Sequence, residues 1–347
     1  MMTLSHHPGD AEFQRAQQLS AQRQHGAARP LLAAAAALEH PQALCWLAIA
    51  THHGLGAPAD PLSAIPLYQR AVRAGDADAG IRLAVMRLHG RWLPLDVFAL
   101  LDELQPALRQ AHPQVREWLH VLGADATASY DGAREQLEAA LSAPAPTLQP
   151  LSAGRLVAIA DDVVPAPERQ RLIALARPRL QRAMVINPHT RSLVEDPARN
   201  NRSAPLGTGA PDLVLAFSEW RIARAAGMPL AHAEYLAALC YAPGEEYRPH
   251  RDYLQPATHP DQFAAGAPGQ RVRTAFAYLN DVPAGGATEF PLLDLRIAPK
   301  AGRVVVFDNV RADGAPDPQT LHAGRPVDAG EKWLATLWLR QGPLRLA

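Results

Sequence analysis

A repeat of 36 residues constrains this chain more than any other feature of its sequence. The tetrapeptides HPQA, DADA and HPQV begin at residues 40, 76 and 112, so the interval is 36 residues each time. Three further kinds of position recur at this interval: Leu47, Leu83 and Leu119; Gly54 and Gly90; and Asp60 and Asp96. Alanine and leucine at helical spacing predict a helix–turn–helix unit for each copy. One such unit cannot bury its apolar face alone, so the units are expected to stack into a solenoid.

The repeating region resembles the Sel1-like repeats, which are relatives of the tetratricopeptide repeats. The resemblance is clearest in ALCWLAIATHHGLGAPADPLSAIPLYQRAVRAGDADA and covers residues 28–122, with a third copy that is degraded at Trp92, Leu93 and Pro94. Residues 1–143 are therefore expected to form an α-helical repeat domain. Two roles stay open for it: a surface that docks a protein or peptide partner, and a stabilising or dimerising shell. We interpret His52 and His53 as solvated turn residues.

The character of the sequence changes after a proline-rich stretch, APAPTLQPLSAG, whose residues 144–152 predict a short, stiff linker. Residues 155–164 predict a strand, and residues 167–183 and 211–227 predict helices. Beyond residue 234 the apolar segments are short, and Gly and Pro turns such as PAGGA and PKAG separate them. Several short strands without helices between them indicate a sandwich or barrel, which we assign to a second domain at residues 153–347.

The segment EEYRPHRDYL, residues 245–254, places His250 and Asp252 two positions apart in a stretch expected to be a strand. Alternate residues share one face of a strand, so the imidazole and the carboxylate are predicted to lie side by side. His322 is the candidate third ligand. Two histidines and one carboxylate on one side of a metal leave its other positions open, as in non-haem Fe(II) oxygenases.

Lysine is rare in this chain: the sequence contains 34 lysines and arginines, of which only Lys300 and Lys332 are lysines. Lys300 lies in the turn PKAG and is expected to be exposed. Lys332 follows His322 by ten residues. We predict that it lies one strand over from the metal, where its ammonium would bind the far carboxylate of an acid that chelates the metal.

Together these residues resemble the prolyl 4-hydroxylase branch of the 2-oxoglutarate/Fe(II) dioxygenases, over residues 154–341. YAPGEEYRPHRDY resembles the family pattern Y-x-P-G-x-x-Y-x-x-H-x-D, and RVRTAFAYLNDVPAGGATEFP resembles R-x-x-T-x-x-x-Y-L-x-D-x-x-x-G-G-x-T-x-F-P. The resemblance implies a double-stranded β-helix, or jelly roll, with flanking helices. It also implies Fe(II) as the cofactor, 2-oxoglutarate and O2 as cosubstrates, and ascorbate as a reductant. It implies no catalytic side chain beyond the metal ligands His250, Asp252 and His322.

The same resemblance assigns five further positions. Tyr241 and Thr288 are expected to contact 2-oxoglutarate together with Lys332, although an ordinary strand tyrosine and a turn threonine remain the alternatives. Another three residues match positions that line the peptide groove of the family, with structural packing as the alternative: Arg271, Trp338 and Arg340. Arg340 replaces a histidine often found at its position, which leaves the substrate preference open.

A second H-x-D pair, His259 and Asp261, is not expected to bind metal. Pro260 intervenes, and the surrounding Pro, Gly and Ala residues disfavour a strand. We interpret residues 254–270 as a mobile loop that covers the substrate.

The reaction indicated is hydroxylation of an unactivated C–H bond. A prolyl residue in a protein or peptide recruited by the helical repeats is the first hypothesis for the substrate. A free amino acid or small metabolite is the second. The third hypothesis is a non-catalytic repeat scaffold whose oxygenase domain is silent.

Charge and hydropathy restrict the partners and the location of the chain. A formal net charge of zero argues against a nucleic-acid partner. No apolar run reaches the roughly 18 residues of a transmembrane helix, so no membrane partner is expected. Cys45 and Cys240 are expected to lie in different domains, which fits a reducing compartment better than a disulfide framework. We therefore expect a cytoplasmic protein.

Overall fold

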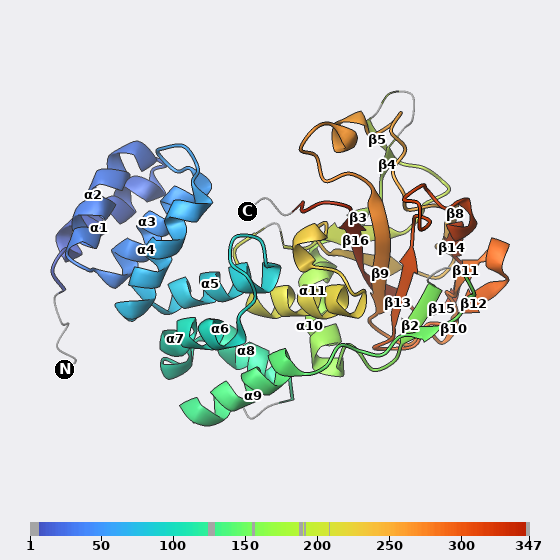
Figure 1. The fold of residues 1–347 in the computed structure, drawn as a ribbon, viewed down its shortest axis with the longest axis horizontal. Helices are drawn as coiled ribbons and strands as arrows, with labels where there is room; N and C mark the ends of the chain where they lie inside the picture. Colours follow the sequence, from blue (N-terminus) through green and yellow to red (C-terminus); the bar gives the residue numbers. More distant parts are fainter. Residues whose placement is uncertain are drawn as a thin grey trace. The chain divides into compact units, whose positions relative to one another are not determined.

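The computed structural model describes residues 7–123, 129–154, 157–186, 190, 192–207 and 209–344. Their contacts divide the chain into two units (Figure 1). The first holds the described residues up to Ser142, apart from Val121–Gly123, and the second holds those from Ala143 onward. We describe each unit by itself.

The first unit is built from helices joined by short turns. The helices are α1 (Asp10–Ala21), α2 (His25–Ala37), α3 (Pro41–His53), α4 (Pro61–Arg73), α5 (Ala77–His89), α6 (Val97–Glu103), α7 (Gln105–Arg109), α8 (Pro113–Val121) and α9 (Tyr130–Ser142). Successive helices pack against one another from α1 to α5, as stacking of helical pairs requires. The helical character of the region is as predicted.

The 36-residue interval is a repeat of helix ends. Asp60, Asp76 and Asp96 each stand at the N-cap of a helix, and each carboxylate accepts a hydrogen bond from the backbone N–H three residues later, at 3.0, 2.7 and 3.0 Å. Such caps satisfy donors that the helix itself leaves free. Gly54 and Gly90 end α3 and α5 in the left-handed conformation, with φ of 74° and 69°.

The third copy of the repeat is irregular, as its degraded sequence indicates. The first helix of the second copy, α4, is continuous over Pro61–Arg73, whereas its counterpart is divided into α6 and α7. Pro106 lies in the first turn of α7, a position where its missing N–H leaves no helical hydrogen bond unmade.

His52 contradicts the interpretation of residues 52 and 53 as solvated turn residues. Helix α3 extends through His53, and the side chain of His52 is buried, whereas His53 is exposed. The two rings stack with their centroids 4.6 Å apart, and Trp92 contacts His52 edge-on. Burial lowers the pKa of His52 to about 4, so this imidazole is neutral at physiological pH.

The second unit contains two larger antiparallel sheets and two small two-stranded sheets. The large sheet has the order β1 (Gln149–Pro150), β2 (Val157–Ala160), β13 (Val304–Asp308), β9 (Arg271–Tyr278), β16 (Lys332–Arg340), β7 (Ala237–Tyr241), β6 (Arg202–Pro205) and β3 (Gln181–Arg182). The small sheet has the order β12 (Leu295–Ile297), β11 (Thr288–Phe290), β14 (His322–Gly324) and β8 (Tyr247–His250). The two-stranded sheets are β10 (Ala284–Gly285) with β15 (Val327–Ala329), and β4 (Val185–Ile186) with β5 (Leu193–Val194).

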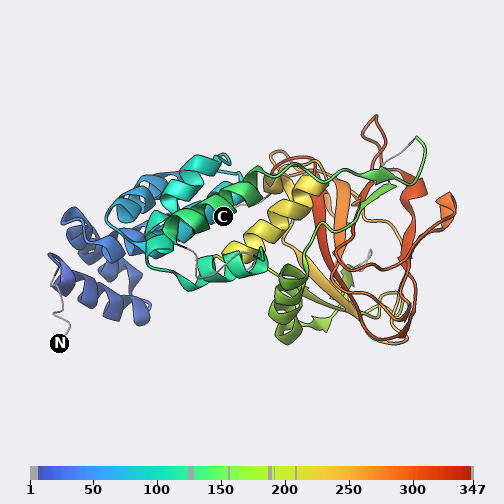
Figure 2. The same cartoon turned by 90° about the horizontal axis from the view of Figure 1, so that it is seen from below.

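The large sheet has a core on each face. On one face, Phe307 of β13 contacts Phe290 of β11 with ring centroids 5.2 Å apart, so apolar side chains fill the space between the sheets. On the other face lie α10 (Ala166–Ala176) and α11 (Leu213–Ala225), as Figures 1 and 2 show. This layering confirms the predicted fold class, a helical region followed by a two-sheet β domain with flanking helices.

The elements differ from the expected ones at two places near the start of this unit. The helix expected at residues 167–183 ends at Ala176, because Pro178 cannot donate to the preceding turn, and residues 181–182 instead form β3. Within the predicted linker, Gln149 and Pro150 pair with β2 as an edge strand. Proline is tolerated at such an edge because its missing N–H faces away from the sheet.

Both cysteines are buried and unpaired, Cys45 in the first unit and Cys240 in the second, as predicted. Among the helices of the described residues, none is long and apolar enough to cross a membrane.

Candidate metal centre and cavity

His250 and His322 face each other across one strand pair of the small sheet. His250 is the last residue of β8, His322 is the first residue of β14, and the two are direct partners in the register. Their ring centroids lie 4.3 Å apart. The sequence separates these histidines widely, and the antiparallel pairing brings them together.

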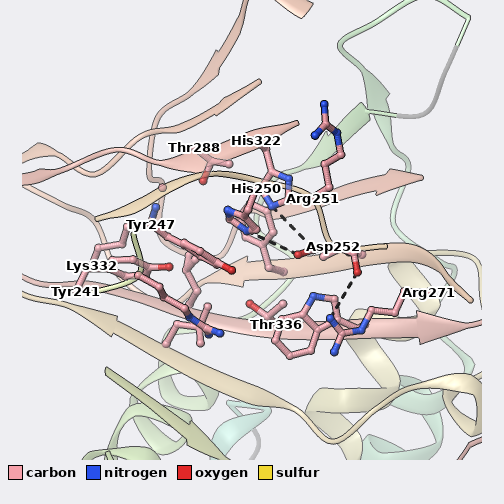
Figure 3. Close-up of a pocket in the computed structure, with 17 residues that line it drawn as sticks. Tyr241, Tyr247, His250, Arg251, Asp252, Arg271, Thr288, His322, Lys332 and Thr336 are labelled. Carbon is pink, nitrogen blue, oxygen red and sulfur yellow. Dashed lines mark hydrogen bonds and ion pairs between the residues drawn. The ribbon is translucent and has the colours of Figure 1, made fainter. Parts of the chain in front are cut away.

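Asp252 completes the cluster, but from a position that differs from the prediction. Strand β8 ends at His250, so Asp252 lies two residues beyond the strand and does not share a strand face with the histidine. The strand ends there because β14 offers no pairing partner beyond His322. The carboxylate nevertheless lies near both imidazoles, with Oδ1 3.7 Å from Nε2 of His250 and Oδ2 3.8 Å from Nε2 of His322 (Figure 3).

The main chain orients both imidazoles for metal binding. Nδ1 of His250 lies 2.9 Å from the carbonyl oxygen of Arg248, and Nδ1 of His322 lies 3.0 Å from that of Thr320. A carbonyl can only accept, so each Nδ1 carries the proton and each Nε2 keeps its lone pair. One ligand atom from each of His250, Asp252 and His322 lies within 4.8 Å of the others.

The charges of the cluster also suit a cation. Burial is the main cause that lowers the pKa of His250, to about 3, and the neighbouring His322 lowers it further. Burial alone would raise the pKa of Asp252, but the two histidines, Arg271 and the Thr274 hydroxyl hold it below its usual value. Neutral imidazoles and an ionised carboxylate are the forms that bind a metal.

A cavity of about 160 Å³ adjoins the cluster. Its walls come from both sheets, and they include the three metal-ligand candidates and five of the six other predicted site residues: Tyr241, Thr288, Lys332, Arg271 and Trp338. The prediction that Lys332 lies one strand over from the metal is wrong. Lys332 begins β16 in the large sheet, so it faces the histidines from the opposite sheet.

Lys332 is the most unusual residue of the cavity. Its side chain is 0% exposed, and within the described part of the chain its Nζ has no hydrogen-bond partner. Nζ lies 5.0 Å from the ring centroid of Tyr241. Burial lowers the pKa of Lys332 to about 7. A buried ammonium without an acceptor costs free energy, and an anion bound beside it would remove that cost. The site is therefore suited to an anionic ligand.

The opposite strand leaves room for such a partner. A Cβ on Gly324 of β14 would lie 3.6 Å from Lys332 Nζ and 3.6 Å from the Tyr241 hydroxyl. Glycine therefore keeps open the space between these two polar atoms and the small sheet. Thr288 also lines the cavity, and its hydroxyl accepts a 2.8 Å hydrogen bond from Tyr278. The predicted contacts of Tyr241 and Thr288 with 2-oxoglutarate stay predictions.

The three predicted substrate contacts fall in two places. Arg271 lines the cavity, but Glu234 binds its guanidinium with two hydrogen bonds of 2.7 Å, and the guanidinium stacks on the ring of Trp338 at 4.4 Å. Trp338 also lines the cavity, and its Nε1 is buried without a partner among the described residues.

Arg340 is not among the residues that line the cavity. It is buried and donates hydrogen bonds to Glu234 at 3.1 Å, to Gln262 at 3.0 Å and to the carbonyl of Gly269 at 3.0 Å. Two of these partners belong to residues 254–270, which include a short 3-10 turn at Pro260–Phe263. A substrate contact of Arg340 stays a prediction.

Four residues that contact the predicted site residues were not themselves predicted. Glu234 pairs with Arg271 and Arg340, Thr274 donates to Asp252, Asn309 donates to Thr274, and the Tyr247 ring stacks on His250 with centroids 3.4 Å apart. Tyr247 and Thr274 belong to the motifs quoted above, which was an available signal. Glu234 and Asn309 lie outside the motifs and gave none. His259 and Asp261 do not join the metal cluster, as predicted.

Comparison with known proteins agrees with this geometry. The family model described as "2OG-Fe(II) oxygenase superfamily" matches residues 236–340. The chain is 37% identical over 180 residues to prolyl 4-hydroxylase subunit alpha-1 of Rattus norvegicus, a match that covers 52% of this chain and 33% of that protein. It is 33% identical over 209 residues to prolyl 4-hydroxylase 1 of Arabidopsis thaliana, which covers 54% of this chain and 69% of that protein.

The helical region resembles a solved Sel1 repeat protein from Oxalobacter formigenes. The two are 17% identical with a TM-score of 0.30, and the match covers 40% of this chain and 60% of the other. The repeat architecture itself rests on the recurring helix caps.

The chain belongs to the 2OG-Fe(II) oxygenase superfamily and is prolyl 4-hydroxylase-like, with His250, Asp252 and His322 as its candidate facial triad. It spans about one third of the length of the vertebrate alpha-1 subunits that it matches. The family implies Fe(II) and 2-oxoglutarate as cofactors, and the residues present fit both. The triad offers the nitrogen and oxygen donors of a non-haem iron site. The unpartnered ammonium of Lys332 and the space beside Gly324 fit the carboxylate of a small dicarboxylic acid.

Proposed function

We propose that this chain hydroxylates a prolyl residue in a peptide or protein, in a reaction that depends on Fe(II) and 2-oxoglutarate. The observation that carries the reaction type is the buried, unpartnered Lys332 in a cavity whose far wall holds the triad. The prolyl substrate is supported by the relatives named as prolyl 4-hydroxylases, at 37% and 33% identity.

The iron with 2-oxoglutarate would supply the oxidising chemistry: O2 is split, 2-oxoglutarate leaves as succinate and CO2, and one oxygen atom enters a C–H bond. The residues of this chain would hold and orient the reactants. His250, Asp252 and His322 occupy one side of the metal and leave the positions toward the cavity open. Lys332 would bind the distal carboxylate of 2-oxoglutarate, which restores its ammonium form and fixes the other end of the molecule toward the triad.

The remaining walls would position the substrate and exclude water. The indole N–H of Trp338 has no partner within the described ranges, and it lies at the edge of an aromatic face, which suits a peptide carbonyl next to a proline ring. Glu234 neutralises Arg271 and keeps it stacked on Trp338, so this wall is rigid.

A groove in the helical unit supports recruitment of a protein substrate by the repeats. It is lined by residues of α2, α3, α4 and the turn after α3, has a volume of about 750 Å³, and combines Leu47, Pro66 and Leu67 with Arg29 and Arg70. An extended segment with apolar and acidic side chains would complement this surface. Replacement of Arg29 by Glu is expected to raise the KM for a whole-protein substrate and to leave the KM for a short peptide unchanged. Equal effects on both would favour a purely structural shell.

A second candidate substrate is a free amino acid or small metabolite. Arg199 favours it, because it is another cation that lines the cavity. Among the described residues its guanidinium donates to the Asn201 side chain at 3.4 Å and to the Met184 carbonyl at 3.3 Å, rather than to a carboxylate. Its side chain stacks over Tyr247 at 4.9 Å. Such a cation could bind the carboxylate of an amino acid.

The experiment that separates the two substrates compares a proline-rich peptide with free L-proline under ¹⁸O2. The proposal predicts one ¹⁸O atom per modified prolyl residue in the peptide, detected by mass spectrometry, and a weakened KM for the peptide when Trp338 is replaced by Ala. Incorporation into free proline alone, together with a KM that rises when Arg199 is replaced by Met, would favour the second candidate. Labelling of neither compound, with succinate still formed, would exclude both substrates and leave the reaction class standing.

A further inference from the structure

Asn309 lies behind the metal ligands, directly after β13, and is 0% exposed. Hydrogen bonds fix its main chain on both sides: its N–H donates to the carbonyl of Val272 at 2.8 Å, and its carbonyl accepts from the N–H of Asp317 at 3.0 Å. Its side-chain Nδ2 donates to Oγ1 of Thr274 at 2.9 Å. The amide is therefore rigidly placed, and Asn309 is not itself among the residues that line the cavity.

The hydrogen bond from Asn309 fixes the proton of Thr274. A threonine hydroxyl has one proton, and Oγ1 of Thr274 lies 2.8 Å from Oδ2 of the ionised Asp252. The carboxylate can only accept, so the hydroxyl donates to it and must accept from its other neighbour. Among the described residues, the donor to the Thr274 hydroxyl is the side-chain N–H of Asn309. The hydrogen bonds therefore run in one direction: Asn309 donates to Thr274, and Thr274 donates to Asp252. Thr274 is 1% exposed, so solvent does not compete for the proton.

This chain of hydrogen bonds restricts how Asp252 can turn. Oδ2 is held by Thr274 on the side of the large sheet, whereas Oδ1 lies 3.7 Å from Nε2 of His250. Asp252 needs this support because it lies beyond the end of β8, where no ladder of strand hydrogen bonds fixes its backbone. The two histidines, in contrast, are oriented by carbonyls of their own segments.

We propose that Thr274 and Asn309 are positioning residues that hold the Asp252 carboxylate in its metal-binding orientation. Asn309 acts on the metal only through Thr274. The inference rests on the proposed use of the triad as a metal site, and it concerns retention of the metal rather than turnover. Partners that orient a ligating carboxylate in this way typically contribute about 10- to 100-fold to metal affinity.

The test measures Co(II) affinity of the metal-free full chain by calorimetric titration, without cosubstrate. Thr274→Val keeps the shape of the side chain and removes the hydroxyl, so it is expected to weaken Co(II) binding about 10- to 100-fold. Thr274→Ser restores the hydroxyl and most of the affinity. Asn309→Ala weakens binding in the same direction, because the hydroxyl of Thr274 is then free to turn away from Asp252.

A double variant and a matched control separate positioning from general packing. Because Asn309 acts through Thr274, Thr274→Val with Asn309→Ala should bind Co(II) no more weakly than Thr274→Val alone. The control is Asn280→Ala: the Asn280 side chain also makes three hydrogen bonds to main-chain groups, of Asp281, Glu331 and Trp333, but none to a metal ligand. It should lower the unfolding temperature and leave the Co(II) affinity of the folded protein unchanged.

Losses of affinity that add in the double variant, or an unchanged affinity in Thr274→Val, would overturn the proposal. If Thr274→Val does not fold, Thr274→Ser and Asn309→Ala still decide the matter, because the proposal requires a weaker site only in the latter. The outcome is separable from the proposed function. Wild-type protein that binds Co(II) as predicted but forms no hydroxylated product contradicts the function alone, and turnover with unaltered affinities contradicts the positioning role alone.

Discussion

The two faces of strand β16 carry side chains of different kinds. One face packs on the helices and is apolar throughout: Trp333, Ala335, Leu337 and Leu339. The other lines the cavity and carries buried polar groups: Lys332, Thr336 and Trp338, with Leu334 between them. Successive side chains of a strand point to opposite faces of the sheet, so the two sets alternate along β16. The same strand therefore stabilises the fold on one face and holds the candidate site on the other, and substitutions on the two faces should have separable effects.

The largest effect on stability is expected on the apolar face. Leu337→Ala removes a fully buried side chain and should lower the free energy of unfolding by about 2–5 kcal/mol. Chemical denaturation measures this loss. The KM for 2-oxoglutarate of the protein that remains folded should not change, and a large rise in this KM would show that the two faces are coupled.

On the cavity face, Lys332→Met should have the opposite pattern. The KM for 2-oxoglutarate should rise about 10- to 100-fold, because a charged hydrogen bond of about 1.5–3 kcal/mol is lost. The ligand-free protein should become more stable, since a buried ammonium without a partner is replaced by an apolar chain. Thermal unfolding with and without 2-oxoglutarate tests both statements, and a destabilised ligand-free variant would mean that the ammonium has a partner in solution.

Lys332 should also make stability depend on pH. Burial lowers its pKa from 10.5 to about 7, so between these two values the unfolded chain binds more protons than the folded chain. The free energy of unfolding of the ligand-free protein should therefore rise with pH across this window. The difference between wild type and Lys332→Met isolates this contribution. A difference that is constant from pH 7 to pH 10 would show that Lys332 keeps its ordinary pKa.

The smallest effect is expected from the other lysine. Lys300 lies on the surface with its side chain 45% exposed, and its Nζ binds Asp161 at 2.7 Å. Lys300→Met should change the free energy of unfolding by only about 0–1 kcal/mol and should leave the KM for 2-oxoglutarate unchanged. This substitution is the matched control for Lys332→Met. If Lys300→Met raised the KM for 2-oxoglutarate as much as Lys332→Met does, binding of 2-oxoglutarate in the cavity beside Lys332 would be contradicted.

The helical repeat and the identity of the three ligands were predictable from the sequence because each depends on residue type at fixed spacing. Asp60 and Asp96 recur at the repeat interval because both cap helices. A facial triad needs two imidazoles and one carboxylate, and the candidate ligands His250, Asp252 and His322 provide them. The layered β domain likewise follows from short strands between Gly and Pro turns.

Features that depend on where strands end or on which sheet a strand joins were not predictable in this way. Nothing in EEYRPHRDYL shows that β8 stops at His250, because the stop depends on the length of its distant partner β14. The position of Lys332 in the opposite sheet depends on pairing between β16, β7 and β9. His52 was interpreted as a solvated turn residue, yet the helix extends through position 53 and the ring of His52 is buried.

The most direct test of the proposed reaction is the iron-dependent formation of succinate from 2-oxoglutarate by wild type and His322→Ala, with each protein shown to be folded by circular dichroism. Wild type loaded with Fe(II) should form succinate in step with the 2-oxoglutarate consumed, and a proline-rich peptide should increase the rate. His322→Ala should form none above background, because the metal loses one of its three ligands. Folded, iron-loaded wild type that forms no succinate under any of these conditions would contradict the assignment of this cavity to an oxygenase reaction.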